Sequence, residues 1–507
     1  MLSKVHSFSI WGIEGYPVIV EVDTGKGMPG ISMVGLPDQS VKESKDRIKP
    51  AIRNSGFDFP NKKITVNLAP ADIKKEGPYF DLPIAMGILA TEGKIPSEHL
   101  EEFFFIGELA LDGSVRYVKG ILPIALKMQE LKMGKLIIPY ENADEAGIVE
   151  NIEVYPVKTL SECVEFLQGK KKIEKYYVNI KELFELKKEY KVDFKEVKGQ
   201  FYVKRAIEVA VSGGHNILMI GSPGSGKSMI ASRIPTILPS LTLHESLEIT
   251  KIHSVTGLAK EGLVTTRPFR NPHHSISDIA LIGGGSIPKP GEVSLAHNGV
   301  LFLDELPEFH RDVLESLRQP MEQGYVSISR AKGRVIFPSK FILVGAMNPC
   351  PCGWYGDSSH HCHCTLSQIL KYRKKISGPL LDRIDIHIEV SSLSPELLVR
   401  EKEEESSEEI RERVEKARQI QENRFKDTGI YFNSHMTSSM MKKYCVMDDK
   451  AKNLLETALT KMKFSARAYD KIRKVARTIA DLENSEIIHA NHISETIQYR
   501  SLDREIW

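Results

Sequence analysis

The run Gly221-Ser222-Pro223-Gly224-Ser225-Gly226-Lys227-Ser228 decides the fold of this 507-residue chain. An apolar run, 217–220, precedes it, and a helical pattern, 229–233, follows it. Glycines at this spacing let successive backbone N–H groups face phosphate oxygens at a helix N-terminus. We expect Lys227 to reach the β- and γ-phosphates and the Ser228 hydroxyl to bind Mg²⁺. The run therefore predicts a nucleoside triphosphate site at the end of a strand in an α/β sheet.

Two carboxylates follow a second apolar run, Gly299-Val300-Leu301-Phe302-Leu303. Such a run is typical of a strand buried on both faces, and open α/β sheets bind ligands at the carboxyl ends of their strands. We expect Asp304 to hold Mg²⁺, directly or through water, and Glu305 to act as general base on the attacking water. Taken without the glycine-rich run, the same pair also fits an ordinary capped turn.

A third apolar run, 341–346, ends at Met347-Asn348-Pro349. We expect the Asn348 amide to position the attacking water against the γ-phosphate. An Asn before Pro also commonly starts a turn, which is the alternative interpretation.

The composition indicates a globular protein, with 41% hydrophobic and 27% charged residues. The length predicts two or three domains. A net charge of only +2 excludes a basic field over the whole molecule, so any contact with nucleic acid must come from a local patch. No apolar run reaches the roughly 18 residues that a membrane crossing needs, and the N-terminus lacks a signal pattern. We expect a cytoplasmic protein without membrane contact.

The chain divides into four segments by pattern. Residues 1–170 combine strand-like runs (17–22 and 63–68), a hairpin turn at Asp112-Gly113 and a helical pattern over 121–131, which predicts an α/β or α+β domain. Residues 171–196 form a charged, partly helical connector. Residues 197–392 alternate strands and helices, as a parallel sheet with crossover helices does. Residues 393–507 are almost purely helical and predict a lid, with helices over 401–426, 449–481 and 492–499.

Four of the six cysteines lie in an insertion over 350–364, as the pairs Cys350/Cys352 and Cys362/Cys364. Four thiolates in two Cys-x-Cys pairs can close a tetrahedral Zn²⁺ site in a reducing compartment. Iron–sulfur ligation, a redox pair and the absence of any metal are the alternatives. Because the insertion follows Asn348 directly, a metal here would stiffen the exit of that strand.

Alternating polar and apolar residues over 326–336 predict a hairpin that turns at Lys332-Gly333. Arg330, Lys332 and Arg334 place three cations near its tip. Cations there would follow a phosphate backbone without reading sequence. We therefore expect Lys332 to be the principal DNA contact, with Arg330 and Arg334 as the next candidates. The alternative is a solvated hairpin of ordinary charge.

Several runs together resemble the magnesium-chelatase-like AAA+ ATPases, and within them the ComM/YifB group: 268–274, 283–285, 296–305 and 347–353. The resemblance covers nearly the whole chain. It implies a ring, usually a hexamer, with ATP and Mg²⁺ between subunits and Asn348 as the first sensor residue. It also implies a DNA motor: a helicase or branch-migration factor on single-stranded or branched DNA. Such a motor would act with recombination proteins in homologous recombination during natural transformation.

Two arginines follow from the same resemblance. The segment 378–385 is similar to the family segment that carries the arginine finger, which implies that Arg383 stabilises charge on a neighbouring subunit's γ-phosphate. Ser465-Ala466-Arg467-Ala468 resembles the second sensor motif and implies that Arg467 contacts the γ-phosphate of its own subunit. The alternatives are an internal pair of Arg383 with Asp382 or Asp385, and Arg473 or Arg477 in place of Arg467.

The N-terminal segment resembles the proteolytic domain of Lon proteases, through 75–83 and 106–109. Lon chemistry needs a serine nucleophile and a lysine base. Tyr79 and Leu122 stand at those positions, so we expect no peptidase activity and an assembly or DNA-binding role instead. Two other functions share the ATPase core and stay open: a protein-remodelling ATPase and a chelatase-type motor subunit.

Overall fold

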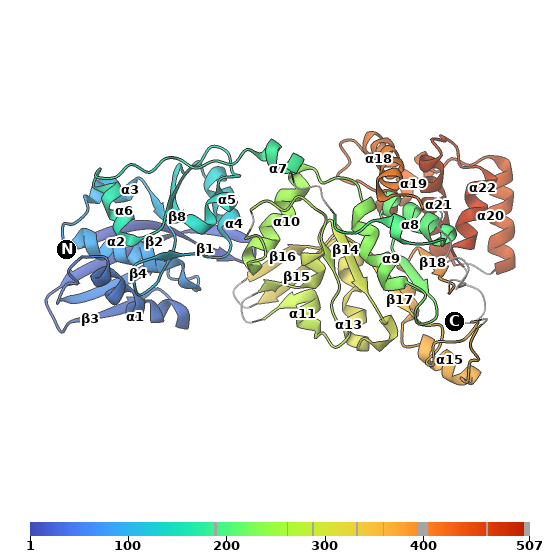
Figure 1. Cartoon of the computed structure of the whole chain (residues 1–507), viewed down its shortest axis with the longest axis horizontal. Coiled ribbons are helices and arrows are strands. Elements are labelled where there is room, and N and C mark those ends of the chain that lie inside the picture. The colour runs from blue at the N-terminus through green and yellow to red at the C-terminus, as the bar shows by residue number, and fades with distance from the viewer. Residues whose placement is uncertain are drawn as a thin grey trace.

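The computed structural model describes residues 1–186, 190–260, 262–285, 288–330, 333–357, 359–392, 404–462 and 465–500. The chain is elongated, with an N-terminal sheet at one end, a second sheet in the middle and C-terminal helices at the other end (Figure 1). No helix in the described part of the chain has both the length and the apolar character needed to cross a membrane.

The N-terminal sheet has seven strands in the order β3-β4-β2-β1-β5-β8-β9. Helix α2 packs against β1 and β2, and each of its eleven residues is buried, which suits its apolar sequence. The expected strands and the expected helix over 121–131 are confirmed. The expected turn at Asp112-Gly113 is confirmed as well, because β6 and β7 flank it as an antiparallel pair. The strands are β1 (Leu2–Trp11), β2 (Glu14–Gly25), β3 (Gly30–Val34), β4 (Lys63–Ala69), β5 (Phe104–Phe105), β6 (Glu108–Leu109), β7 (Val115–Arg116), β8 (Lys135–Pro139) and β9 (Glu153–Val157). The helices are α1 (Gln39–Asn54), α2 (Asp81–Thr91), α3 (Ser97–Glu101), α4 (Ile121–Glu130), α5 (Ala143–Ala146), α6 (Leu160–Leu167) and α7 (Ile180–Leu186).

The central sheet has five parallel strands in the order β11-β14-β17-β10-β18. Every residue of β10 and β14 is buried, which is why both read as continuous apolar runs. Its strands are β10 (Ile217–Ile220), β11 (Phe269–Arg270), β14 (Gly299–Leu303), β17 (Phe341–Met347) and β18 (Ile386–Glu389). Around it lie α8 (Phe201–Gly213), α9 (Lys227–Arg233), α10 (Leu243–Thr256), α11 (Asp278–Ile282), α12 (Glu292–Leu295), α13 (Arg311–Ser316), α14 (Arg318–Gln323), α15 (Leu366–Arg373) and α16 (Gly378–Leu381).

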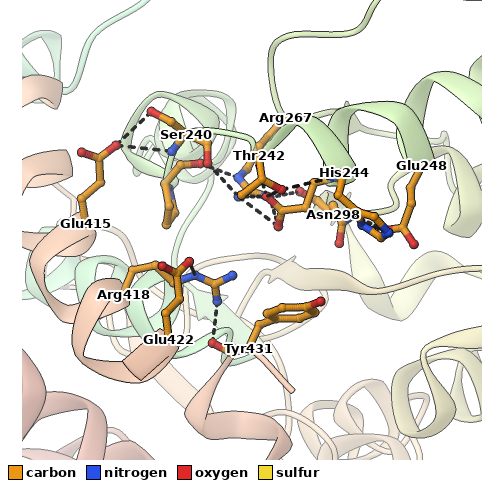
Figure 2. A network of polar contacts seen from close by, with 12 residues as sticks. Ser240, Thr242, His244, Glu248, Arg267, Asn298, Glu415, Arg418, Glu422 and Tyr431 are labelled. Atoms are coloured by element: carbon orange, nitrogen blue, oxygen red, sulfur yellow. Dashed lines mark hydrogen bonds and ion pairs between the residues drawn. The ribbon is translucent and has the colours of Figure 1, made fainter. Parts of the chain in front are cut away.

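The C-terminal helices share a hydrophobic core with the central sheet. Val414 of α18 and Val475 of α21 belong to the same buried cluster as Ile217 of β10, while a second cluster lies among the helices themselves. Figure 2 shows polar contacts at this boundary: Ser240 Oγ donates to Glu415 of α18 across 3.0 Å, and within the C-terminal segment Arg418 donates to the Tyr431 carbonyl across 2.5 Å. The helices are α18 (Ser407–Arg424), α19 (Ser438–Tyr444), α20 (Asp449–Met462), α21 (Ala466–Leu482) and α22 (Ala490–Gln498).

Helix α10 connects the N-terminal sheet to the central one. On one side, Ser254 of α10 donates to the buried Glu145 carboxylate and its carbonyl accepts the Gly120 N–H at 3.1 Å. On the other side, Glu248 of α10 accepts a hydrogen bond from His297 at 3.2 Å, just before β14. His297 Nδ1 in turn accepts the Lys340 N–H at 3.0 Å, just before β17. The helix therefore contacts the N-terminal unit and the starts of two central strands.

Candidate active site

The phosphate loop fills the turn between β10 and α9. Gly224 and Gly226 have φ of 78° and 89°, a left-handed backbone that favours glycine. The Lys227 ammonium lies inside the loop and donates to the carbonyls of Gly221 at 2.7 Å and Ser222 at 3.0 Å. Burial lowers the pKa of Lys227 from its ordinary value, against the opposing effect of Asp304. The loop thus holds its lysine where phosphate oxygens would compete for the same ammonium.

A pair of oxygens lies beside this loop. The Ser228 hydroxyl at the start of α9 donates to Asp304 Oδ2 across 2.6 Å, directly after β14. Mg²⁺ takes oxygen ligands, so a hydroxyl and a carboxylate at this separation are a donor set that fits it. The two predicted Mg²⁺ ligands, far apart in sequence, therefore lie together.

Asn348 completes this side of the site. Its Oδ1 lies 3.4 Å from Lys227 Nζ, because β17 lies between β10 and β14 and its carboxyl end reaches the same edge of the sheet. The structure thus brings together four of the predicted residues, namely Lys227, Ser228, Asp304 and Asn348.

Glu305 has a further neighbour that the sequence analysis did not assign. His274 Nδ1 lies 3.4 Å from Glu305 Oε2, and its ring lies 4.1 Å from that of His273. Glu305 itself has φ of 52°, and its N–H bonds to Asp304 Oδ1 at 2.9 Å. The His273-His274 pair was a signal for a polar site, but nothing in its spacing pointed to Glu305.

The two predicted arginines lie at the opposite, amino-terminal edge of the sheet. Arg383 precedes β18, and the Asp385 N–H bonds to the carbonyl of Asn216, just before β10. Arg467 donates to Asp382 at 3.3 Å, and its side chain is 70% exposed. The phosphate loop follows the other end of β10, and four strand residues span about 13 Å. This placement differs from the expected contact of Arg467 with the nucleotide of its own subunit.

The structure shows which partners Arg383 and the two alternative arginines, Arg473 and Arg477, have within the chain. Arg383 pairs with Glu322 of α14, whereas Asp385 pairs with Lys471 at 3.1 Å. Arg477 is buried and pairs with Asp481 at 3.1 Å, so it serves packing inside the helical unit. Arg473 donates to the Met441 carbonyl at 3.0 Å.

The four clustered cysteines converge as predicted. Their sulfur atoms all lie within 4.8 Å of one another. Cys350 Sγ lies 3.3 Å from Cys352 Sγ and 3.7 Å from Cys362 Sγ, and Cys352 Sγ lies 3.6 Å from Cys362 Sγ. Zn–S bonds of about 2.3 Å in a tetrahedron place sulfur atoms roughly 3.8 Å apart. The sulfur set therefore fits Zn²⁺ in number, type and spacing.

The predicted hairpin over 326–336 is confirmed as β15 (Tyr325–Arg330) and β16 (Gly333–Pro338), which pair antiparallel. Lys332 lies outside the described residues. Arg330 Nε donates to the Gly285 carbonyl at 3.1 Å, beside the short pair β12 (Gly283–Gly284) and β13 (Lys289–Pro290). Arg334 Nε donates to Ser327 Oγ at 2.6 Å, and both arginines are exposed.

Five parallel strands in this order, with a phosphate loop, an acidic pair and an asparagine at neighbouring strand ends, define a P-loop nucleotide-binding protein of the AAA+ class. Three family descriptions match the chain: "Magnesium chelatase, subunit ChlI" over 193–398, "Subunit ChlI of Mg-chelatase" over 20–142, and "Magnesium chelatase, subunit ChlI C-terminal" over 404–500.

Several relatives match along nearly their full length. Competence protein ComM of Haemophilus influenzae is 44% identical over 509 residues, covering 99% of this chain and 98% of the relative. The protein YifB of Escherichia coli is 42% identical over 506 residues, with the same coverage. The chain therefore belongs to the ComM/YifB family of magnesium-chelatase-like AAA+ proteins. Membership implies ATP and Mg²⁺ as ligands of the site.

Two weaker similarities cover parts of the chain. Lon protease 2 of Bacillus subtilis is 29% identical over 126 residues, which is 25% of this chain and 22% of that protein. The probable DNA helicase MCM9 of Arabidopsis thaliana is 26% identical over 205 residues, which is 38% of this chain and 27% of that protein.

Proposed function

We propose that this protein is an ATP-hydrolysing, ring-shaped DNA motor, a helicase or branch-migration factor for homologous recombination during natural transformation. The main observation that supports an ATP-hydrolysing motor is that Lys227, Ser228, Asp304 and Asn348 lie together at one edge of the central sheet. The DNA assignment draws on the relative named a competence protein and on the partial similarity to a probable DNA helicase.

In the proposed reaction, Lys227 leaves its carbonyl acceptors and binds the β- and γ-phosphates. Ser228 and Asp304 would hold Mg²⁺, which would neutralise charge on the phosphates. Glu305 accepts a proton from the attacking water, and the Asn348 amide orients that water in line with the γ-phosphate. The water oxygen bonds to the γ-phosphorus as the bond from that phosphorus to the bridging oxygen of the β-phosphate breaks, and ADP and phosphate leave. His274 contacts Glu305 and keeps its carboxylate in place.

We propose that Arg383 and Arg467 act on the nucleotide of the next subunit. Both lie at the edge of the sheet opposite the phosphate loop of their own chain. Arg467 is 70% exposed there, whereas Arg383 is 13% exposed and would leave Glu322 to reach a neighbour's nucleotide. Guanidinium groups suit this role because they stay charged and donate two hydrogen bonds to phosphate oxygens. Sites shared head to tail close into a ring, and we propose a hexamer.

DNA would contact the hairpin β15–β16 by charge. Its exposed Arg330 and Arg334, together with Lys332, would follow the phosphate backbone inside the ring. We take Lys332 as the principal contact, as the sequence predicts.

The other assignments complete the proposal. Cys350, Cys352, Cys362 and Cys364 would hold a structural Zn²⁺, which suits a reducing cytoplasm. Residues 1–170 would form a Lon-like unit without peptidase activity: Tyr79 and Leu122 lie in one apolar cluster that Leu247 of α10 also contacts. Residues 171–196 would be the connector, 197–392 the AAA+ core and 393–507 the helical lid.

The test is ATP turnover of the full chain with and without single-stranded or forked DNA. We expect DNA to stimulate turnover, Lys332→Ala to remove the stimulation while basal turnover stays, and Lys461→Ala on the exposed face of α20 to change neither. Turnover that no DNA form changes would overturn the DNA motor in favour of a protein-remodelling ATPase. Stimulation by a porphyrin-type macrocycle with a metal ion would favour the chelatase-type subunit.

A further inference from the structure

The cysteine-bearing loop packs directly on the phosphate loop. Gly353 lies against Pro223, and a Cβ at position 353 would come within 2.7 Å of two Pro223 ring carbons. Gly353 also has φ of 88°, so both backbone conformation and space require glycine here. The loop that carries the sulfur cluster therefore packs closely against Pro223 of the phosphate loop.

Asp357 provides a polar link between the same two loops. Its side chain is 5% exposed, and it accepts a hydrogen bond from the Ser392 hydroxyl at 3.1 Å. Ser392 Oγ in turn lies 2.8 Å from Ser222 Oγ of the phosphate loop. Because the Ser222 carbonyl accepts from Lys227, Ser392 and Ser222 together join Asp357 to the lysine of the phosphate loop.

Asp357 is fixed within its own loop as well. The backbone N–H groups of Ser359 and His360 donate to Asp357 Oδ1 at 2.8 and 3.0 Å. The His360 ring stacks on Trp354 with ring centroids 3.9 Å apart. The backbone between Cys352 and Cys362 thus carries the Asp357 anchor, while the sulfur atoms at its two ends converge on one point.

A metal at the four sulfurs would close this loop at both ends, and closure removes conformational freedom that would otherwise let Asp357 leave Ser392. We propose that the metal-loaded cysteine loop is a clamp that holds the phosphate loop in its nucleotide-binding form through Asp357, so that metal loading raises affinity for ATP. The clamp rests on the proposed function only in assigning ATP to residues 221–228 and a metal to the cysteines. Asp357 is a positioning residue that acts through Ser392 and Ser222.

The experiment uses the full chain, with Zn²⁺ content by elemental analysis and ATP affinity by calorimetry without DNA. We expect stoichiometric Zn²⁺ in the purified protein, weaker ATP binding by about tenfold after chelation, and recovery when Zn²⁺ is added back. That size corresponds to one lost charge-assisted hydrogen bond. Asp357→Asn should keep its Zn²⁺ yet bind ATP about tenfold more weakly, whereas Asp449→Asn, at an exposed site on α20, should bind both normally.

A spectroscopic readout separates the clamp from general unfolding. With Trp11 and Trp507 replaced by Phe, Trp354 alone reports the loop, and its emission should change as Zn²⁺ is titrated into the stripped protein. Protein without bound metal would overturn the zinc site and the clamp together. Bound Zn²⁺ with ATP affinity unchanged by chelation or by Asp357→Asn would overturn the clamp and leave the zinc site and the motor standing.

Discussion

The Ser228 hydroxyl donates to Asp304 Oδ2 across 2.6 Å, which joins the first turn of α9 to the end of β14. Ser228 and Asp304 lie far apart in the sequence, so no local turn brings them together. Their strands do, because β10 and β14 both pair in parallel with β17 and end at one edge of the sheet. Both oxygens are therefore aimed at the same position beside the phosphate loop.

This bond predicts how turnover depends on Mg²⁺. Ser228→Ala removes one oxygen ligand, and the Mg²⁺ concentration for half-maximal ATP turnover should rise about 10- to 100-fold. A Mg²⁺ titration of turnover at saturating ATP measures it, with Ser232→Ala, one turn further along α9, as the matched control. An unchanged titration for Ser228→Ala would remove Ser228 from the metal site.

The contact of His274 with Glu305 predicts that substitutions of these two residues lower kcat by different amounts. Glu305→Gln should lower kcat by about 10²- to 10⁴-fold, as expected for loss of a general base, while ATP still binds. His274→Ala should lower kcat by about tenfold at unchanged ATP affinity, because the carboxylate keeps its chemistry but loses its orientation. His273→Ala is the control, since the ion pair with Glu305 comes from His274, whereas His273 Nδ1 lies 2.9 Å from Ser275 Oγ. Equal turnover for wild type and His274→Ala would contradict the positioning role.

The arginines at the far edge of the sheet predict complementation between subunits. Arg383→Ala and Glu305→Gln proteins should each be inactive, yet a mixture allowed to assemble together should recover turnover at up to about one quarter of its sites. Recovery occurs because an intact Glu305 in one subunit faces an intact Arg383 in the next. Turnover of mixed subunits over a range of ratios measures it. A mixture as inactive as its components would show that Arg383 acts within its own chain.

Glu145 predicts a pH dependence of folding. Burial raises the pKa of this carboxyl, and its hydrogen bonds to Ser254, Leu122 and Asn142 only partly oppose the rise. The folded state therefore binds this proton more tightly than the unfolded chain. Its contribution is complete below the unfolded pKa of about 4.3 and declines as pH rises through the folded pKa.

The difference between wild type and Glu145→Gln isolates this group. In that pH window the free energy of unfolding of the wild type should fall more steeply than that of the variant, by at most about 1.4 kcal/mol per pH unit. Denaturant unfolding at a series of pH values measures both slopes, and Glu141→Gln, at an exposed position nearby, should keep the wild-type slope. Parallel slopes for wild type and Glu145→Gln would contradict the prediction.

Local patterns predicted much of this molecule. The strand–loop–helix around 217–233, the hairpin over 326–336 and the helix at 121–131 all follow from short runs with their own turn or capping chemistry. Helix ends were less exact: the expected helix over 449–481 is two helices in the structure, α20 and α21, because Ser465 caps a new start by accepting the Ala468 N–H.

Contacts between distant segments were not predictable in the same way. The resemblance implied the role of Arg467, but only the strand directions show that it lies at the edge opposite the phosphate loop. Likewise, no spacing links Asp357 to Ser392 or His274 to Glu305, since each pair meets only after the sheet has formed. Motifs therefore identified the chemistry, while the packing decided which edge and which neighbour each side chain serves.

Helix α10 has a mechanical consequence. A movement of the N-terminal unit relative to the core must either break the bond between Glu145 and Ser254 or drag the helix with it. Glu248 on that helix is hydrogen-bonded to His297, and His297 is hydrogen-bonded to the backbone just before β17. Movement of α10 would therefore shift the strands that end at Asp304 and Asn348. A partner that displaces the N-terminal sheet would in this way change the position of the side chains that face the γ-phosphate.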